Sequence, residues 1–225
     1  MEDIIPVLKY IIAIITLPAI VIALVVYADY KLTHYIWQRF AAQEDLKFCH
    51  GNFLGLKDIK PSVKGLYRSL DFTLSLVDIS GKRKSVHTSI VMKLPVDNSY
   101  NLAICPSYPF QRFATGLFDA AAITRSFSYE ETLTDDPEFD SSFIVTGSSE
   151  LMPLFTPELR KTLLNMRDLV NIRIDKETIT YETPGVIRNL SFLKCITEIM
   201  YYMTVNISRI NSDKDVSRRK ELQIR

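Results

Sequence analysis

The N-terminal segment constrains this chain most, because residues 6–27 are almost entirely apolar. Between Ile11 and Val26 there is no charge, and Thr16 is the only polar side chain. As a helix, about 20 apolar residues span a hydrocarbon core of roughly 30 Å. The pattern therefore predicts a transmembrane anchor at residues 1–30, in contact with the lipid bilayer through residues 6–27.

A cleaved signal peptide is the alternative interpretation of this segment. The residues at 26–28, Val-Tyr-Ala, would offer a cleavage site, but the tail at 1–3, Met-Glu-Asp, is acidic where a signal peptide is basic. The apolar core is also long for a signal peptide. We therefore expect an uncleaved anchor, with Pro18 kinking the helix in the middle of the span.

The charges on either side of the anchor predict its orientation. Glu2 and Asp3 precede it, whereas Lys31, Arg39 and Lys47 follow it. Because basic flanks stay on the cytoplasmic side, the sequence predicts a single-pass protein of the cell membrane with its soluble domain in the cytoplasm.

The rest of the chain divides into three expected parts. Residues 31–48 read as a juxtamembrane stalk helix, 49–210 as an α+β soluble domain, and 211–225 as a charged flexible tail. The stalk has apolar residues such as Leu32 and Ile36 at helical spacing, and Trp37 is expected near the membrane interface. Its repeat is too short for a coiled coil, so we expect it to pack on the domain.

Alternating patterns predict a mostly antiparallel sheet packed by helices. Apolar and polar residues alternate at 70–76 and again at 86–94, which indicates a hairpin. Further strands are expected at Leu102–Cys105, Ile123–Tyr129, Phe139–Val145, Leu169–Ile174 and Thr178–Glu182. Helices are expected after the capping sequence Thr156-Pro157-Glu158 and from Ile187 to Ile210.

Sequence motifs for catalysis or cofactor binding are not found in this chain. The histidines and cysteines lack the paired spacing of a zinc site, and no nucleophile elbow or dinucleotide fingerprint is present. The formal net charge of +1 gives no overall attraction to nucleic acid. We therefore expect no catalytic residues, no cofactor, no metal and no nucleic-acid partner.

Two oppositely charged segments are the candidate contact sites. Residues 57–93 carry a net charge of about +5 and residues 119–150 about −7. The candidate contacts within them are Lys82, Arg83, Lys84, Asp135, Asp136, Glu138 and Asp140. The basic residues could meet anionic lipid or a partner. The two patches could also face each other or solvent, and the acidic loop could hold calcium or catalyse a reaction.

The acidic segment also resembles a motif in uncharacterised membrane-anchored proteins of bacteria and archaea. Residues 134–145 are similar to their pattern T-G-D-x-x-F-D-x-x-F-x-V, with Asp135 in place of the glycine. The segments at 63–68 and 154–164 are also similar to theirs. The resemblance covers residues 35–205 and implies a tethered domain without adding any catalytic residue.

Together these features predict an anchored protein whose domain acts in binding or assembly, as an accessory subunit beside a membrane-protein partner. The alternative is a membrane-tethered hydrolase or metal-dependent enzyme that uses the acidic loop. Core positions are expected at Phe72, Leu74, Phe139 and Phe143.

Overall fold

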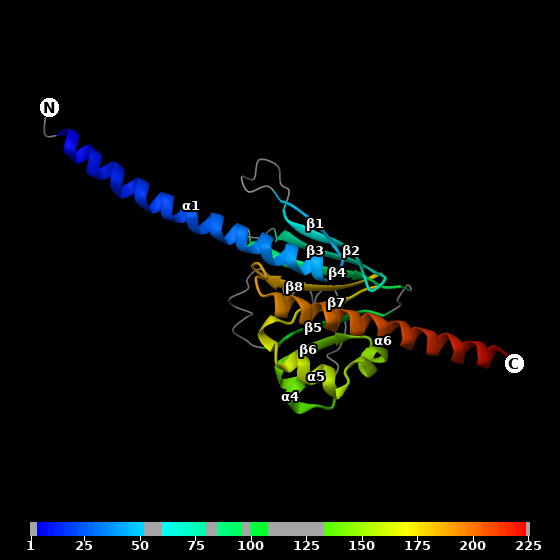
Figure 1. The fold of residues 1–225 in the computed structure, drawn as a ribbon. Helices are drawn as coiled ribbons and strands as arrows, with labels where there is room; N and C mark the ends of the chain where they lie inside the picture. The colour runs from blue at the N-terminus through cyan, green and yellow to red at the C-terminus, as the bar shows by residue number, and fades with distance from the viewer. Residues whose placement is uncertain (1–3, 52–59, 80–84, 96–99, 108–132, 224–225) are drawn as a thin grey trace.

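The computed structural model describes residues 4–51, 60–79, 85–95, 100–107 and 133–223, with the backbone alone for 4–15, 168 and 213–223. It is an α+β domain at the end of a long N-terminal helix (Figure 1). The helices are α1 (Ile4–Gln43), α4 (Pro137–Ser142), α5 (Pro157–Leu164) and α6 (Leu190–Gln223), with 3-10 helices η1 (Ser149–Leu154) and η2 (Arg167–Leu169). The strands are β1 (Lys47–Cys49), β2 (Ser62–Tyr67), β3 (Leu70–Ile79), β4 (Ser85–Lys93), β5 (Leu102–Pro106), β6 (Phe143–Gly147), β7 (Ile172–Ile174) and β8 (Thr178–Pro184).

The strands form one eight-stranded sheet in the order β1-β2-β3-β4-β8-β7-β5-β6, and every neighbouring pair is antiparallel. The register aligns apolar residues across the strands, because Leu74 pairs with Ile90 and Ile90 pairs with Tyr181. All three are fully buried. The alternation predicted for 70–76 and 86–94 therefore gives the sheet one apolar face.

Helices α1 and α6 cover that apolar face. From α1, Trp37 and Phe40 are fully buried, and the Phe40 ring lies 5.9 Å from the ring of Phe72. From α6, the buried stripe follows helical spacing and consists of Leu193, Ile196, Met200, Met203 and Ile207. The predicted stalk thus packs on the domain, but the expectation that Trp37 lies near the membrane interface is wrong, because its side chain is inside the core.

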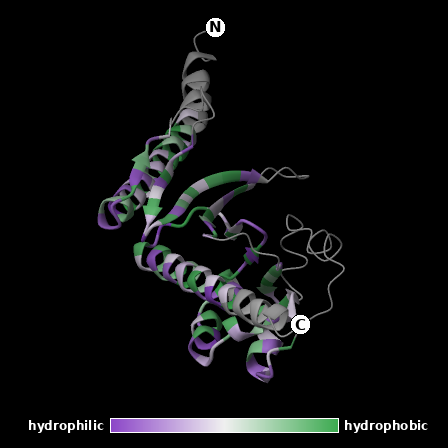
Figure 2. Ribbon diagram, turned by 90° about the vertical axis from the view of Figure 1, so that its right-hand side faces the viewer, coloured by the Kyte–Doolittle hydropathy of each residue, from purple (hydrophilic) through white to green (hydrophobic). Residues whose placement is uncertain are grey.

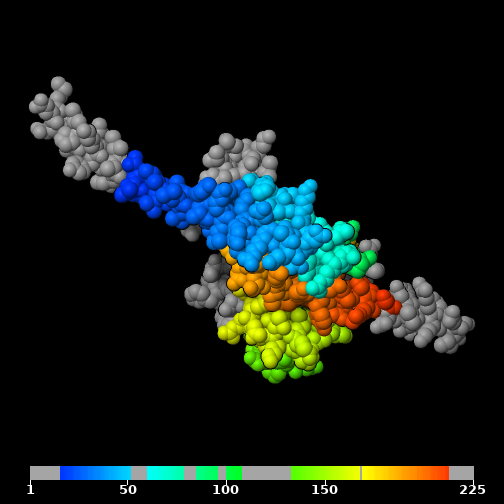
Figure 3. Space-filling view, viewed as in Figure 1, coloured from blue at the N-terminus to red at the C-terminus, as the bar shows by residue number. Residues whose placement is uncertain are grey.

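Residues 16–28 of α1 are exposed and mostly apolar. By length and composition α1 can cross a membrane, and Leu17, Leu24 and Val25 are each more than half exposed. The helix continues through Pro18 and stands out from the domain, whereas α6 leaves the domain on the other side (Figures 1 and 3). Figure 2 shows apolar residues along α1 above the point where it meets the sheet.

Several predicted elements differ from the observed ones. Residues 139–145 are not one strand, because α4 ends at Ser142 and β6 begins at Phe143. The predicted stalk helix ends at Gln43, and Lys47 and Phe48 belong to β1. Helix α6 continues to Gln223, beyond the predicted end at Ile210. The strand expected at 123–129 lies outside the described residues.

Candidate functional site at the anchor–domain junction

The segment that leads into α6, and α6 itself, tie α1 to the rest of the domain. The indole Nε1 of Trp37 donates a buried hydrogen bond of 3.0 Å to the carbonyl oxygen of Ile187. The next residue, Arg188, forms an ion pair with Asp29 of α1. A second ion pair joins the Lys194 Nζ to Glu44 Oε1 at 2.9 Å. These contacts and the apolar packing fix α1 against the domain from residue 29 onward.

A cluster of aromatic rings lies on α1 just after the apolar segment. The ring of His34 is 4.0 Å from that of Tyr30, 5.3 Å from Phe48 and 5.7 Å from His50. The Tyr30 hydroxyl donates a hydrogen bond of 2.6 Å to the carbonyl oxygen of Gly51. The end of β1 is therefore held against the helix beside the point where α1 leaves the domain.

His34 is the buried member of this cluster. Its side chain is 8% exposed, and its Nε2 has no hydrogen-bond partner. Burial lowers the pKa of His34, with smaller contributions from His50 and Lys31. The imidazole is therefore neutral at pH 7, and its Nε2 carries either a lone pair or an N–H without a partner, according to the tautomer. Sequence reasoning treated His34 and His50 as scattered, because only the fold brings them together.

The acidic motif is built into a helix cap. Asp136 is the N-cap of α4, and its carboxylate accepts a hydrogen bond of 3.2 Å from the Phe139 amide. The carboxylate of Asp140 accepts bonds of 3.0 and 2.8 Å from the amide and hydroxyl of Thr134. Arg160 of α5 approaches Asp136 at 3.3 Å and donates to the Thr134 carbonyl at 2.9 Å. Two of the four candidate carboxylates thus hold the local fold.

The other two carboxylates, Asp135 and Glu138, are exposed. Asp135 has a φ of +62°, in the left-handed region that favours glycine. The basic candidates, Lys82, Arg83 and Lys84, lie outside the described residues. The four acidic residues therefore do not converge on one pocket in this structure, and two of them face solvent.

A second tie to α6 comes from the tip of the β2–β3 hairpin. Arg68 and Ser69 form its two-residue loop, and both have positive φ values, of 48° and 73°. The Arg68 guanidinium binds both carboxylate oxygens of Glu198 and lies 4.9 Å from the centre of the Tyr201 ring. Tyr67 donates to the same carboxylate at 2.8 Å. These contacts hold a turn that asparagine and glycine usually occupy.

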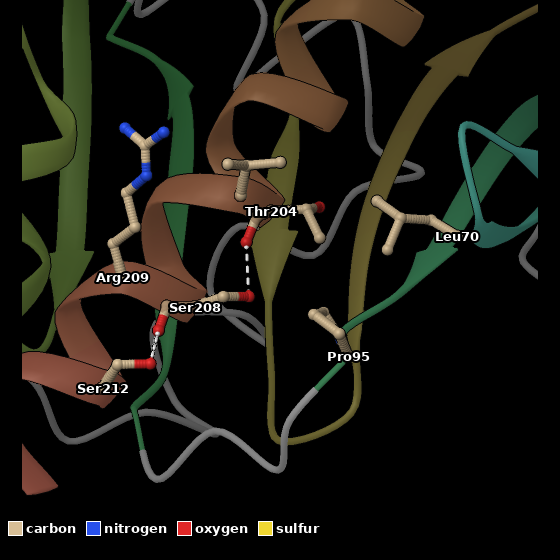
Figure 4. A pocket seen from close by; sticks show the side chains of 7 residues that line it. Leu70, Pro95, Thr204, Ser208, Arg209 and Ser212 are labelled. Atoms are coloured by element: carbon tan, nitrogen blue, oxygen red, sulfur yellow. Dashed lines mark hydrogen bonds between the residues drawn. The ribbon is translucent and has the colours of Figure 1, made fainter.

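A shallow groove of about 480 Å³ lies between α6 and the start of β3 (Figure 4). Thr204, Ser208 and Ser212 line it from α6, and Figure 4 shows Leu70 and Pro95 across from them. Each of these hydroxyls donates to the backbone carbonyl four residues earlier. These three hydroxyls are therefore engaged within α6, and among the lining residues Arg209 carries the charge of the groove. Among the described residues, no group of three or more histidine, cysteine or acidic side chains could hold a metal ion.

Comparisons with known proteins identify no family for this chain. No protein-family model matches it, and no curated protein matches it. One solved structure that resembles it is the crystal structure of the mycobacterial trehalose monomycolate transport factor A, TtfA. That structure is 8% identical, has a TM-score of 0.49, and covers 79% of this chain and 95% of its own. This likeness carries no conclusion about function.

Proposed function

We propose that this chain is a single-pass membrane protein whose cytoplasmic α+β domain binds or assembles with a membrane-protein partner, as an accessory subunit. The observation that carries the proposal is the continuity of α1. One helix contains both the exposed apolar segment around Val25 and the core residues Trp37 and Phe40. A domain joined in this way keeps a fixed orientation relative to its anchor.

The junction contacts also support an uncleaved anchor. Cleavage after Ala28 would cut α1 inside a continuous helix, immediately before Asp29, which pairs with Arg188. The segment that would be removed belongs to the same helix that supplies the core residue Trp37 about two and a half turns downstream. Orientation toward the cytoplasm is supported by the basic flank with Lys31 and Arg39.

The hydrolase alternative has less support. General acid–base chemistry needs carboxylates that can reach a substrate, whereas Asp136 and Asp140 already accept bonds from their own segment. The similarity of residues 134–145 to the motif of uncharacterised membrane-anchored proteins is also part of this proposal. It is supported by the positive φ of Asp135, because glycine is the residue that takes this conformation most readily.

Topology is tested by adding protease to intact cells that produce the full chain. The domain should stay whole, and the purified protein should begin at its original N-terminus. Digestion of the domain in intact cells, or a mature N-terminus at Asp29, would contradict the proposed topology.

Assembly is tested by changing the helical phase between anchor and domain. Two alanines inserted after Tyr27 would rotate the domain by about 200°, whereas four would rotate it by about 40°. Both insertions precede the junction contacts, so thermal unfolding of the domain should not change. A native pull-down from detergent, read by mass spectrometry, should recover a membrane partner with the original chain. We expect the two-residue insertion to lose that partner and the four-residue insertion to retain more of it.

Two outcomes would contradict an oriented assembly. If both insertions retained the partner equally, the domain would not need a fixed orientation. If the original chain recovered no membrane protein above a control that displays an unrelated domain on residues 1–28, the accessory-subunit proposal would fail.

A further inference from the structure

We propose that His34 and His50 bind a divalent first-row transition metal ion, with Zn²⁺ as the representative case, at the junction of anchor and domain. The two imidazoles come from α1 and from the residue that follows β1. Their ring centroids are 5.7 Å apart with an interplanar angle of 31°. Imidazole is a common ligand for ions of this class.

The spacing of the two rings fits a shared ion. A Zn–N bond of about 2.0–2.1 Å places the metal about 3.2 Å from the centroid of each imidazole. Two rings on one ion then have centroids about 5.2 Å apart at a tetrahedral angle and about 6.4 Å apart when linear. The observed 5.7 Å between His34 and His50 lies within this interval.

The burial of His34 is the second observation. Its Nε2 is buried and makes no hydrogen bond, which is costly for a polar atom in a protein interior. A metal ion would use the lone pair of this atom. His50 is exposed and gives an ion access from solvent, while the Tyr30 hydroxyl is engaged with Gly51.

The charge around the site sets its strength. Lys31 lies one turn before His34, and its Nζ is 5.5 Å from the centre of the Tyr27 ring. Among the described residues, no carboxylate lies close enough to act as a third metal ligand beside the two histidines. Two imidazoles with water in the remaining positions make a weaker site than a structural zinc centre with four protein ligands. Such a site would respond to changes in the concentration of metal.

The bound ion would connect the end of β1 to α1 beside the membrane. At present this contact depends on the packing of the His34 ring against Phe48 and on the bond from Tyr30 to Gly51. A bridge between His34 and His50 would add a bond across the same contact. It should therefore stabilise the domain by binding only the folded state.

The test uses the full chain in detergent, without a polyhistidine tag and after treatment with EDTA. Isothermal titration with ZnCl₂ at pH 7.5 should give one site per chain and raise the unfolding temperature. His50→Gln should remove both effects while leaving the metal-free unfolding temperature unchanged, because His50 is exposed. Tyr35→Ala, on the exposed face of the same helix, is the matched control and should bind as the original chain does.

Spectroscopy distinguishes the proposed ligands from other ones. X-ray absorption of the zinc-loaded chain should show scattering from two imidazoles, and Lys31→Gln should tighten binding by removing a nearby cation. Equal zinc binding by the original chain and His50→Gln would overturn the proposal. The absence of zinc, nickel and copper binding would also overturn it and would leave the pair as packed rings.

Discussion

Helix α1 is expected to be part of the folding core, and Phe40→Ala tests this directly. Phe40 is fully buried and packs on Phe72 of β3 with ring centroids 5.9 Å apart. If α1 were only a stalk, the substitution would leave the domain unaffected. Because α1 supplies core residues, the substitution should destabilise the whole domain.

The size of the effect follows from burial. Replacing a buried phenylalanine by alanine costs about 3–5 kcal/mol, because apolar contacts are lost and a cavity remains. The loss of the aromatic pair with Phe72 is part of this cost. For a domain of this size, each kcal/mol corresponds to a change of about 2–4 °C in unfolding temperature. We therefore expect the unfolding temperature to fall by about 6–20 °C.

The only tryptophan of the chain provides the assay, because Trp37 lies one turn from Phe40 and is fully buried. In the folded full-length protein in detergent, its fluorescence should be protected from acrylamide. On unfolding by guanidinium chloride, protection should be lost in the same transition as far-UV circular dichroism. The fluorescence midpoint then reports on α1 and on the sheet together.

Tyr35→Ala is the matched control for Phe40→Ala. Tyr35 is 58% exposed on the same helix, so its removal should change stability by less than about 0.5 kcal/mol. Unfolding of Phe40→Ala at the same denaturant concentration as Tyr35→Ala would refute a core role for α1. Free quenching of Trp37 by acrylamide, while the circular dichroism remains that of a folded sheet, would refute it as well.

Three further predictions concern the core, the acidic motif and pH. Phe143→Ala should cost about 3–5 kcal/mol in denaturant unfolding, because Phe143 is 1% exposed; an unchanged midpoint would show that it is not a core residue. Asp136→Ala should cost about 1–2 kcal/mol by removing the α4 cap, whereas the exposed Glu138→Gln should stay within about 0.5 kcal/mol; equal effects would contradict a capping role. Burial lowers the pKa of His87, so the unfolded chain binds more protons and stability should fall as pH drops below about 6.5. In EDTA, His87→Gln should show a smaller loss of stability between pH 7.5 and 5.5 than the original chain, and an equal loss would contradict this assignment.

The central strands were predictable because each has one apolar face. In β3 and β4 the alternation places Leu74 and Ile90 on the same side of the sheet, and no competing signal is present. Phe72 and Leu74 are buried as predicted. The order of the strands could not be predicted, since β8 pairs with β4 across a long stretch of sequence.

Helix α4 was missed although its signal is present in the sequence. Asp136-Pro137-Glu138 repeats the capping pattern of Thr156-Pro157-Glu158, which correctly predicted the start of α5. The even spacing of Phe139, Phe143 and Val145 was interpreted as strand alternation, although a spacing of four also fits one face of a helix. Both rings are buried, and their centroids are 4.8 Å apart. The burial of both residues was therefore predicted correctly, but Phe139 lies in helix α4 and not in a strand.

The end of α1 shows a different limit of sequence reasoning. The chain turns out of the helix at Asp45, which has a φ of +54° without being glycine, so no ordinary turn signal marks the end. Of the apolar residues at helical spacing on α1, Ile36 packs against the core, whereas Leu32 is 47% exposed and His34 is buried instead. A short strand such as β1 is stabilised by its pairing with β2, which local sequence does not reveal.

The internal bonds of the acidic motif narrow the surface that a partner could use. The carboxylate of Asp136 accepts a bond from the Phe139 amide and lies near Arg160, and that of Asp140 accepts bonds from Thr134, so both are engaged within the domain. Asp135 and Glu138 remain exposed. A partner that recognises negative charge here would meet those two side chains, and their replacement by asparagine and glutamine would change binding without unfolding α4. Any such contact would be limited to two of the four candidate carboxylates, because the other two stabilise the fold of the motif.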